Sequence, residues 1–211
     1  MKFITRLINV TVGLFLYALG IVITLKANIG YAPWDVFHVG LSNITGLSIG
    51  TISIAVGLLI IIIITLLGEK VGLGTILNMI LIGVFIDLIL KINLPKAENF
   101  FIGIIVLIAG LFTIALGMYF YIKSAFGAGP RDSLMVFLAR VTKFPAGLCR
   151  SVLELTVAII GWMLGGMVGA GTVISAFAIG FCVQIIFYIF KFDPTKVKHE
   201  TLAQTFKGGR G

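Results

Sequence analysis

The sequence predicts an all-α membrane protein with six transmembrane helices, arranged as two inverted repeats of three spans each. Three observations lead to this fold class. The chain is 59% hydrophobic and only 11% charged, with a mean hydropathy of +1.16, whereas soluble domains are about 25% charged. It contains six apolar stretches long enough to cross a bilayer. It also repeats its own sequence at a fixed distance of 97 residues.

The internal repeat is a gapless alignment of the first half of the chain on the second. Residues 13–83 share 25 identical pairs with residues 110–180 over 71 columns, where chance would give roughly a tenth. The most distinctive pairs are Lys26 and Lys123, Gly30 and Gly127, Pro33 and Pro130, and Asp35 and Asp132. We therefore expect the membrane domain to be a duplicated unit.

The spans follow from the length of the apolar stretches, because a helix needs about 20 residues to cross the hydrocarbon core. The predicted spans cover residues 7–25, 48–67 and 73–92 in a first repeat (1–95), and 99–121, 145–164 and 171–190 in a second (96–190). Lys2 and Arg6 precede the first span as in a signal peptide, but no small-residue cleavage pattern follows it. We expect this span to be retained. Residues 191–211 form a basic cytoplasmic tail.

A shorter segment follows the first span of each repeat, at residues 34–45 and 131–142. Each is too short and too polar to cross alone, so each repeat has an odd number of spans and the second copy begins on the opposite side. With both termini cytoplasmic, 13 of the 16 Lys and Arg residues lie inside, as the positive-inside rule requires. Residues 26–47 carry one basic residue and the equivalent residues 123–144 carry four, which also indicates opposite sides.

A competing topology remains open for these segments. Short tilted or paired helices can cross a bilayer in spite of a length rule. If residues 34–45 and 131–142 crossed, each repeat would have four spans and the repeats would be parallel. The sequence alone leaves the segments re-entrant, interfacial or spanning.

The repeated motif combines a glycine-rich helix break with a proline that starts the next helix. In the structural interpretation, Asp35 and Asp132 are helix caps near free backbone amides. In the functional interpretation, paired broken helices form a central site, as in many secondary transporters. The candidates for binding a substrate or ion are Lys26, Asn28, Asp35, Lys123, Arg131 and Asp132.

Few polar side chains lie within the predicted spans, and they are costly in lipid unless they face protein or water. These candidates are Asn78, Asp87, Arg150, Glu154, Ser175 and Gln184. Arg150 and Glu154 are four residues apart and can pair on one helix face. Asp87 has Lys91 four residues on, so either an interfacial ion pair or a proton relay suits it.

Other classes of function find little support. No Ser-His-Asp, Cys-His or HExxH arrangement is present, so we expect no enzyme and no cofactor. His38 lacks companion ligands for a metal and is expected to be a plain interfacial histidine, while Cys149 and Cys182 lie in apolar segments. The net charge of +8 comes from loops and the tail, which favours anionic lipid headgroups over nucleic acid as partners.

One stretch resembles a known family. Gly30-Tyr-Ala-Pro33-Trp-Asp35, followed by Gly40-Leu-Ser and Thr45-Gly-Leu-Ser-Ile-Gly50-Thr, is similar to the YczE/YitT-type family of bacterial integral membrane proteins, which is largely uncharacterised. The resemblance covers about residues 5–190. It implies a multi-pass fold in a bacterial cell membrane, and it implies no substrate, cofactor or catalytic residue.

The leading functional hypothesis is a small secondary transporter or permease-like protein with its site at the paired Gly-Pro-Asp breaks. Its substrate would be a small molecule or ion, and a homodimer could complete the pathway. The alternative is a non-transporting membrane scaffold or regulatory subunit, in which the many glycines serve helix packing. An intramembrane enzyme is the third hypothesis, and no set of residues in the sequence supports it.

Overall fold

The computed structural model describes residues 3–197, 199–202 and 204, and every regular element within them is helical. The α-helices are α1 (Phe3–Lys26), α2 (Pro33–Thr45), α3 (Ile49–Leu66), α4 (Leu73–Leu90), α5 (Phe100–Lys123), α6 (Pro130–Thr142), α7 (Ala146–Met163) and α8 (Ala170–Ile189), followed by a 3₁₀ turn, η1 (Pro194–Lys196). All except α2 and α6 are long and apolar enough to cross a membrane. The six predicted spans agree with these helices to within four residues at each end.

The duplication extends to the backbone. Adding 97 to the first residue of α1, α2, α3 and α4 gives the first residue of α5, α6, α7 and α8. Positive φ angles also recur at a distance of 97 residues in three pairs. The angles are 56° at Asn28 and 60° at Ala125, and 112° at Gly30 and 131° at Gly127. The third pair is Gly68 at 86° and Gly165 at 87°. The two halves therefore share their helix boundaries and the turns that end their helices.

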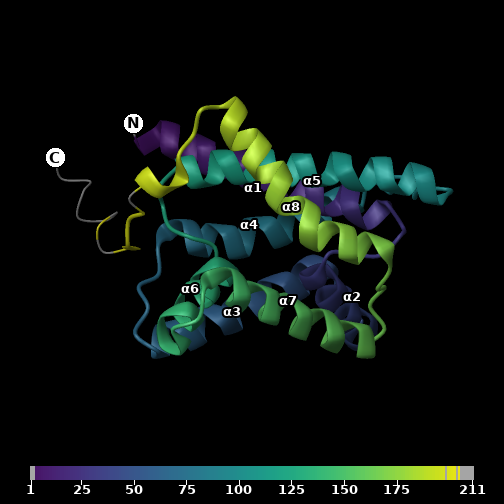
Figure 1. Cartoon of the computed structure of the whole chain (residues 1–211), viewed down its shortest axis with the longest axis horizontal. Coiled ribbons are helices and arrows are strands. Elements are labelled where there is room, and N and C mark those ends of the chain that lie inside the picture. Colours follow the sequence, from purple (N-terminus) through teal and green to yellow (C-terminus); the bar gives the residue numbers. More distant parts are fainter. Residues whose placement is uncertain (1–2, 198, 203, 205–211) are drawn as a thin grey trace.

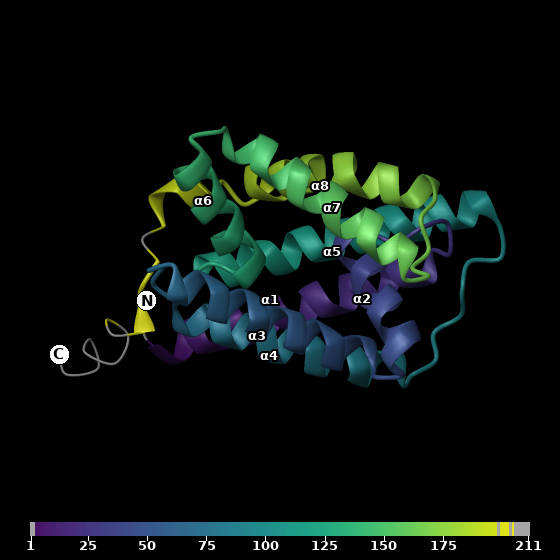
Figure 2. The ribbon, with the colours of Figure 1, turned by 90° about the horizontal axis from the view of Figure 1, so that it is seen from below.

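The helices form two layers, each with members from both repeats (Figure 1). The first layer contains α1, α4, α5 and α8, and the second contains α2, α3, α6 and α7. The main contact between the layers is that of α3 with α4. Figure 2 shows α2 and α6 near opposite ends of the bundle.

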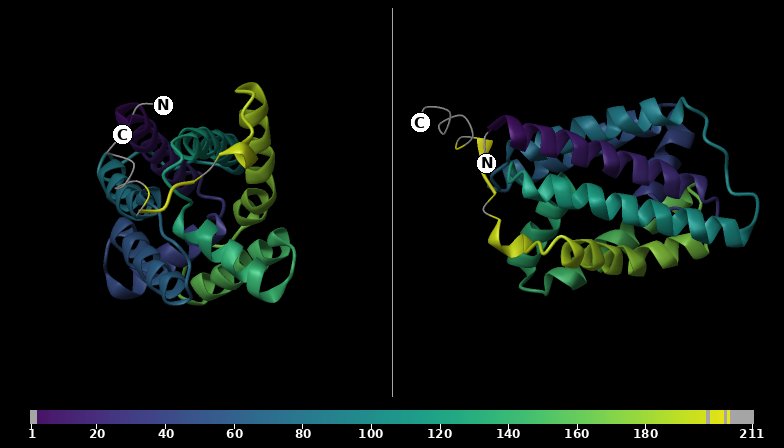
Figure 3. Two further views of the ribbon diagram at one scale, coloured as in Figure 1. Left: turned by 90° about the vertical axis from the view of Figure 1, so that its left-hand side faces the viewer. Right: turned by 90° about the horizontal axis from the view of Figure 1, so that it is seen from above.

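The centre of the first layer is a close contact between α1 and α5. A Cβ atom added to Gly20 would lie 2.6 Å from the backbone nitrogen of Ile114, and one added to Gly13 would lie 2.6 Å from that of Tyr121. Only glycine permits this approach, as is common between membrane helices. Gly13, early in α1, faces the end of α5, and Gly20, later in α1, faces its middle. The two helices are therefore antiparallel (Figure 3). The insertion of the two repeats into a bilayer from opposite sides stays a prediction.

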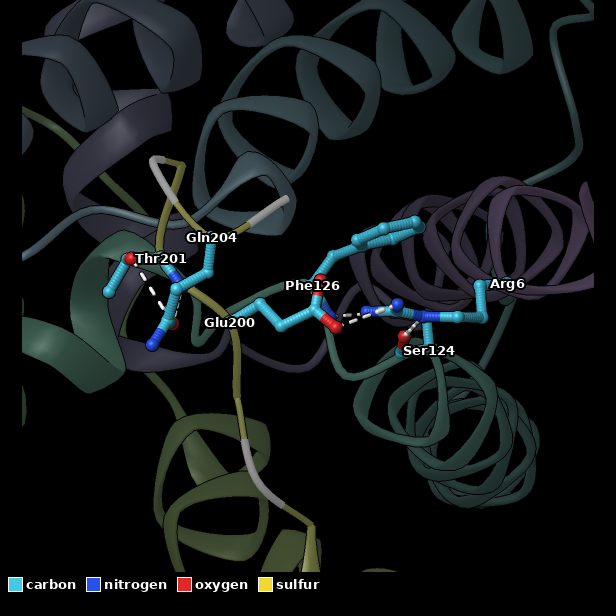
Figure 4. Close-up of polar contacts among 6 residues, drawn as sticks. All are labelled: Arg6, Ser124, Phe126, Glu200, Thr201 and Gln204. Atoms are coloured by element: carbon cyan, nitrogen blue, oxygen red, sulfur yellow. Dashed lines mark hydrogen bonds and ion pairs between the residues drawn. The ribbon is translucent and has the colours of Figure 1, made fainter. Parts of the chain in front are cut away.

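The two ends of the chain lie at the same end of the bundle (Figures 1 and 3). There the tail binds back onto the helices, as Figure 4 shows. The backbone nitrogen of Glu200 donates to the carbonyl oxygen of Ala125 at 3.0 Å. The guanidinium of Arg6 contacts the Glu200 carboxylate at 2.8 Å and the Ser124 carbonyl oxygen at 2.8 Å. The sequence suggested a weakly ordered tail, but this part of it is held to α1 and to the break between α5 and α6.

Candidate functional site

The site is built on the two broken helices. After α1 the chain turns back through Asn28 and Gly30, and α2 begins with Pro33 at its first position; the second repeat does the same before Pro130. Proline suits this position because its missing N–H has no partner in a first helical turn. Asp35 and Asp132 then lie in the first turns of α2 and α6.

The two aspartates line adjoining cavities between the layers. Asp132 lines a cavity of about 100 Å³, and Asp35 lines one of about 80 Å³. The two cavities share six lining residues, which are Tyr17, Ile21, Trp34, Arg131, Arg150 and Glu154. We refer to both together as the central cavity. Its volume suits a few water molecules or a small solute.

Equivalent positions of the two repeats meet in the central cavity. Eleven such pairs line it, and they include Trp34 and Arg131, Asp35 and Asp132, Ser53 and Arg150, Gly57 and Glu154, and Asn78 and Ser175. Among the pairs with a charged member, only the aspartate pair is identical. The duplicated backbone thus encloses one site with different chemistry on its two sides.

Arg131 connects the two halves of this site. Its guanidinium carbon lies 4.7 Å from the centre of the Trp34 ring, which is a cation–π contact. Its Nη2 atom lies 3.5 Å and 3.4 Å from the two ring nitrogens of His38, and His38 Nδ1 is 4.0 Å from Asp35 Oδ1. His38 is only 1% exposed, so its ring is enclosed by the protein, and its depth in the membrane stays a prediction.

Burial acts on the carboxyl groups at the starts of α2 and α6 in the same direction. Burial raises the pKa of the Asp35 carboxyl to about 6, and the nearby Arg131 guanidinium opposes that rise. Burial likewise raises the pKa of Asp132, opposed by the guanidiniums of Arg150 and Arg131. Within the described part of the chain, neither carboxylate accepts a hydrogen bond from a backbone amide, so the capping interpretation has no bond to support it.

The charges in the cavity do not balance when all groups are ionised. Arg150 Nε contacts Glu154 Oε1 at 2.9 Å, the pair that their spacing predicts. Among the described lining residues, the two guanidiniums of Arg131 and Arg150 therefore face three carboxylates, those of Asp35, Asp132 and Glu154. One negative charge is left over, and a proton or a monovalent cation would neutralise it. Such a surplus is costly in a site of low polarity.

The remaining candidates fall inside and outside the cavity. Asn78 and Ser175 line it, and the Ser175 hydroxyl donates to the Gly171 carbonyl oxygen at 2.7 Å. The candidates that do not line it are Lys26, Asn28, Lys123, Asp87 and Gln184. Because α1 and α5 are antiparallel, the lysines that end them lie at opposite ends of the bundle.

Asp87 has a structural role that the sequence did not indicate. Its carboxylate accepts a hydrogen bond from the backbone nitrogen of Gly50 at 2.8 Å and another from the Ser48 hydroxyl. It therefore caps the first turn of α3 from α4 and favours the positive helix end. The predicted ion pair with Lys91 does not form within the described residues.

Several residues of the site were absent from the candidates predicted from the sequence: Tyr17, Trp34 and Ser53 line the cavity, and His38 contacts Arg131. The repeat offered a partial signal. Trp34 and Ser53 are aligned with Arg131 and Arg150, although a third arginine, Arg140, is aligned with Asn43 and lies outside the cavity lining. Among the residues described, no cluster of His, Cys, Asp and Glu could hold a metal ion.

The fold and the site define a class of protein. Six apolar helices, large apolar side chains on their outer faces and polar groups turned inward are the features of a multi-pass helical membrane protein. Residues 4–188 match the model of a family of unknown function (DUF6198), and the chain belongs to this family.

Three relatives support this assignment. The uncharacterized membrane protein YczE of Bacillus subtilis (strain 168) is 37% identical over 174 residues, which are 82% of this chain and 80% of YczE. An uncharacterized protein of Haemophilus influenzae is 34% identical over 184 residues, covering 85% and 84% of the two chains. The B. subtilis protein YyaS is 27% identical over 168 residues, covering 78% and 83%. No solved structure matches the chain. The resemblance to YczE that the sequence motif indicates is thereby confirmed.

Proposed function

We propose that this protein is a small secondary transporter in a bacterial cell membrane, with both termini cytoplasmic, that moves a small polar solute together with a proton. One observation carries the proposal. Eleven pairs of equivalent positions from the two repeats line the central cavity, and that cavity holds Asp35, Asp132 and Arg131. We expect no catalytic activity and no cofactor.

The arrangement of the helices supports alternating access to this cavity. In many secondary transporters, inverted repeats enclose a midplane site that opens first to one side and then to the other. The antiparallel contact of α1 with α5, through equivalent glycines, supports such an inversion here. Because each layer contains helices from both repeats, the layers rather than the repeats would rock against each other.

The surplus of one carboxylate supports proton coupling. The cavity lining holds three carboxylates, those of Asp35, Asp132 and Glu154, and two guanidiniums, those of Arg131 and Arg150, so the site is neutral when one carboxyl is protonated. A bound solute that competes for Arg131 would change the proton affinity of both aspartates. Solute binding and proton binding would thereby be linked, as coupling requires.

Proton movement driven by a solute gradient tests the proposal. The purified protein would be reconstituted in phosphatidylethanolamine and phosphatidylglycerol liposomes loaded with a pH-sensitive dye, and challenged with a panel of small amino acids, organic cations and organic anions. We expect at least one solute to change the internal pH, and Asp35→Asn and Asp132→Asn to lower that rate at least tenfold. Glu98→Gln, an equally conservative change at an exposed loop residue, should keep the wild-type rate. Wild-type rates in both aspartate variants would refute the assigned site.

A non-transporting scaffold or regulatory subunit is the second candidate. The observation that favours it is the large apolar surface of α7 and α8, where Trp162, Met163, Phe177 and Phe181 are each at least 64% exposed. Such a surface suits helices of a partner protein as well as lipid. Under this hypothesis the aspartate variants would alter thermal stability, and no solute of the panel would move protons.

A further inference from the structure

The two repeats differ most in the contact between their last two helices. The helices α3 and α4 are closely packed, whereas their equivalents α7 and α8 scarcely touch. A Cβ atom on Gly50 would overlap the carbonyl oxygen of Gly83. At the equivalent residues, Gly147 and Gly180, an added Cβ atom would have no heavy atom within 4 Å. The same pair of glycines is therefore used as a close contact in one repeat and left apart in the other.

The polar contact beside these glycines differs in the same way. Asp87 on α4 accepts the backbone N–H of Gly50 at the start of α3. Its equivalent on α8 is Gln184, which is exposed and makes no hydrogen bond within the described residues. The amide oxygen of Gln184 has the same accepting ability, and the N–H of Gly147, in the first turn of α7, needs an acceptor.

The position of the open pair explains the exposure of the cavity. The first turn of α7 lies at the end of the bundle that carries the termini, whereas the first turn of α3 lies at the other end (Figure 1). The Arg150 side chain, one turn into α7, is 47% exposed although it lines the central cavity. An exposed residue of the cavity lining therefore lies beside the open α7–α8 pair, whereas α3 and α4 are in contact at the other end.

We infer that Gly147, Gly180 and Gln184 form a second gate, which closes when the gate of Gly50, Gly83 and Asp87 opens. In that second conformation α7 packs on α8 through the two glycines, and the Gln184 amide oxygen caps α7 as Asp87 caps α3 in the present structure. The inference rests on the proposed alternating access and specifies the residues that carry it out. The contact of α2 with α7 through Gly40 and Gly161 persists, because the equivalent residues, Phe137 and Ile64, are too large to form its counterpart.

Paired spin labels test the exchange directly. Labels at Val152 and Phe177 report on α7 and α8, and labels at the equivalent Ala55 and Ile80 report on α3 and α4; all four positions are exposed. Cys149 and Cys182 are first replaced by alanine, and distances are measured by electron resonance in lipid nanodiscs at pH 5 and pH 8. We expect two distance populations in each pair, with the short α7–α8 population matched by the long α3–α4 population.

Two variants bias the exchange in opposite directions. Asp87→Ala removes the cap of α3, so the short α7–α8 population should rise at least twofold. Gly180→Leu has open space in the present structure, so it should fold normally, abolish the short α7–α8 population and lower solute-driven proton flux at least tenfold. Ala55→Leu, at an exposed alanine, is the matched control for adding the same bulk. A single α7–α8 distance that is unchanged by Asp87→Ala at both pH values would overturn the second gate.

The same measurements separate this inference from the proposed function. Exchange of the two distances without solute-driven proton flux would keep the second gate and remove the transport proposal. Flux with fixed distances, and with normal activity in Gly180→Leu, would keep transport and remove the gate.

Discussion

Arg131 is the residue that gives the duplicated site its asymmetry. Its column in the repeat alignment holds Trp34 in the first copy, and the structure stacks the two side chains on each other. The guanidinium thereby reaches His38 and the vicinity of Asp35, on the helix of the other repeat. The second copy thus has a permanent cation where the first has a tryptophan, and this cation acts on the aspartates of both copies.

Replacing Arg131 by glutamine should shift the pH dependence of flux. The guanidinium holds the pKa of Asp35 below the value that burial alone would give, so its removal raises that pKa further. Asp35 then releases its proton only at a higher pH, and the pH of half-maximal solute-driven flux should move upward from near 6. Lys143→Gln, which removes a cation from an exposed loop, should leave the pH profile in place. A downward or absent shift in Arg131→Gln would contradict the role given to this arginine.

The contact of α1 with α5 is the element on which both repeats depend. Gly13 and Gly20 meet Gly117 and Gly110 backbone to backbone, and these four residues are two equivalent pairs at a distance of 97. Each repeat therefore contributes the same two glycines to this contact, and the contact is symmetric between the repeats. A small residue is required at each position, because the facing atoms are backbone atoms that cannot move aside.

Alanine at position 20 should destabilise the bundle. Its Cβ atom would lie 2.6 Å from the backbone nitrogen of Ile114 and 2.7 Å from the carbonyl oxygen of Gly110, and overpacking of this kind costs about 1–3 kcal/mol. We expect a lower unfolding temperature in detergent, followed by tryptophan fluorescence. Gly180→Ala is the matched control, because its Cβ atom meets open space and alanine favours a helix by about 0.5–1 kcal/mol. An unfolding temperature that is unchanged in Gly20→Ala would contradict the close contact.

Sequence reasoning reached the elements more fully than the site. Helix ends could be predicted because bilayer thickness fixes the length of an apolar stretch, and glycine and proline end and start helices by local geometry alone. The partners of a polar side chain depend on how helices pack, which a single sequence does not encode locally. Lys26 and Lys123 share the break motif yet lie away from the cavity, whereas His38 and Tyr17 belong to the site without any local motif. The sequence offers Asp87 either an ion pair with Lys91 or a proton relay, whereas its partners in the structure are Ser48 and Gly50 at the start of another helix.

At the scale of the whole molecule, the two layers rather than the two repeats are the packed units. Each repeat contributes two helices to each layer, so neither half of the chain can bury its polar positions alone. This exchange of helices explains why equivalent positions of both copies line the same central cavity. Alternating access to this cavity depends on the direction in which the two copies insert. Only oppositely inserted copies present the cavity equally to both sides of a membrane.

The direction of insertion can be measured at two equivalent loop residues. Leu47 and Phe144 lie 97 residues apart and are 49% and 59% exposed. Single cysteines there, in a background lacking Cys149 and Cys182, would be treated in intact cells with a maleimide that cannot cross the membrane. Leu47→Cys should react from outside, and Phe144→Cys only after the membrane is permeabilised, because the loop at 123–144 carries four basic residues against one at 26–47. Reaction of both cysteines from the same side would establish parallel repeats. Each half would then have four spans. The two gates would no longer face opposite sides of the membrane, because their equivalence depends on the inversion of the repeats.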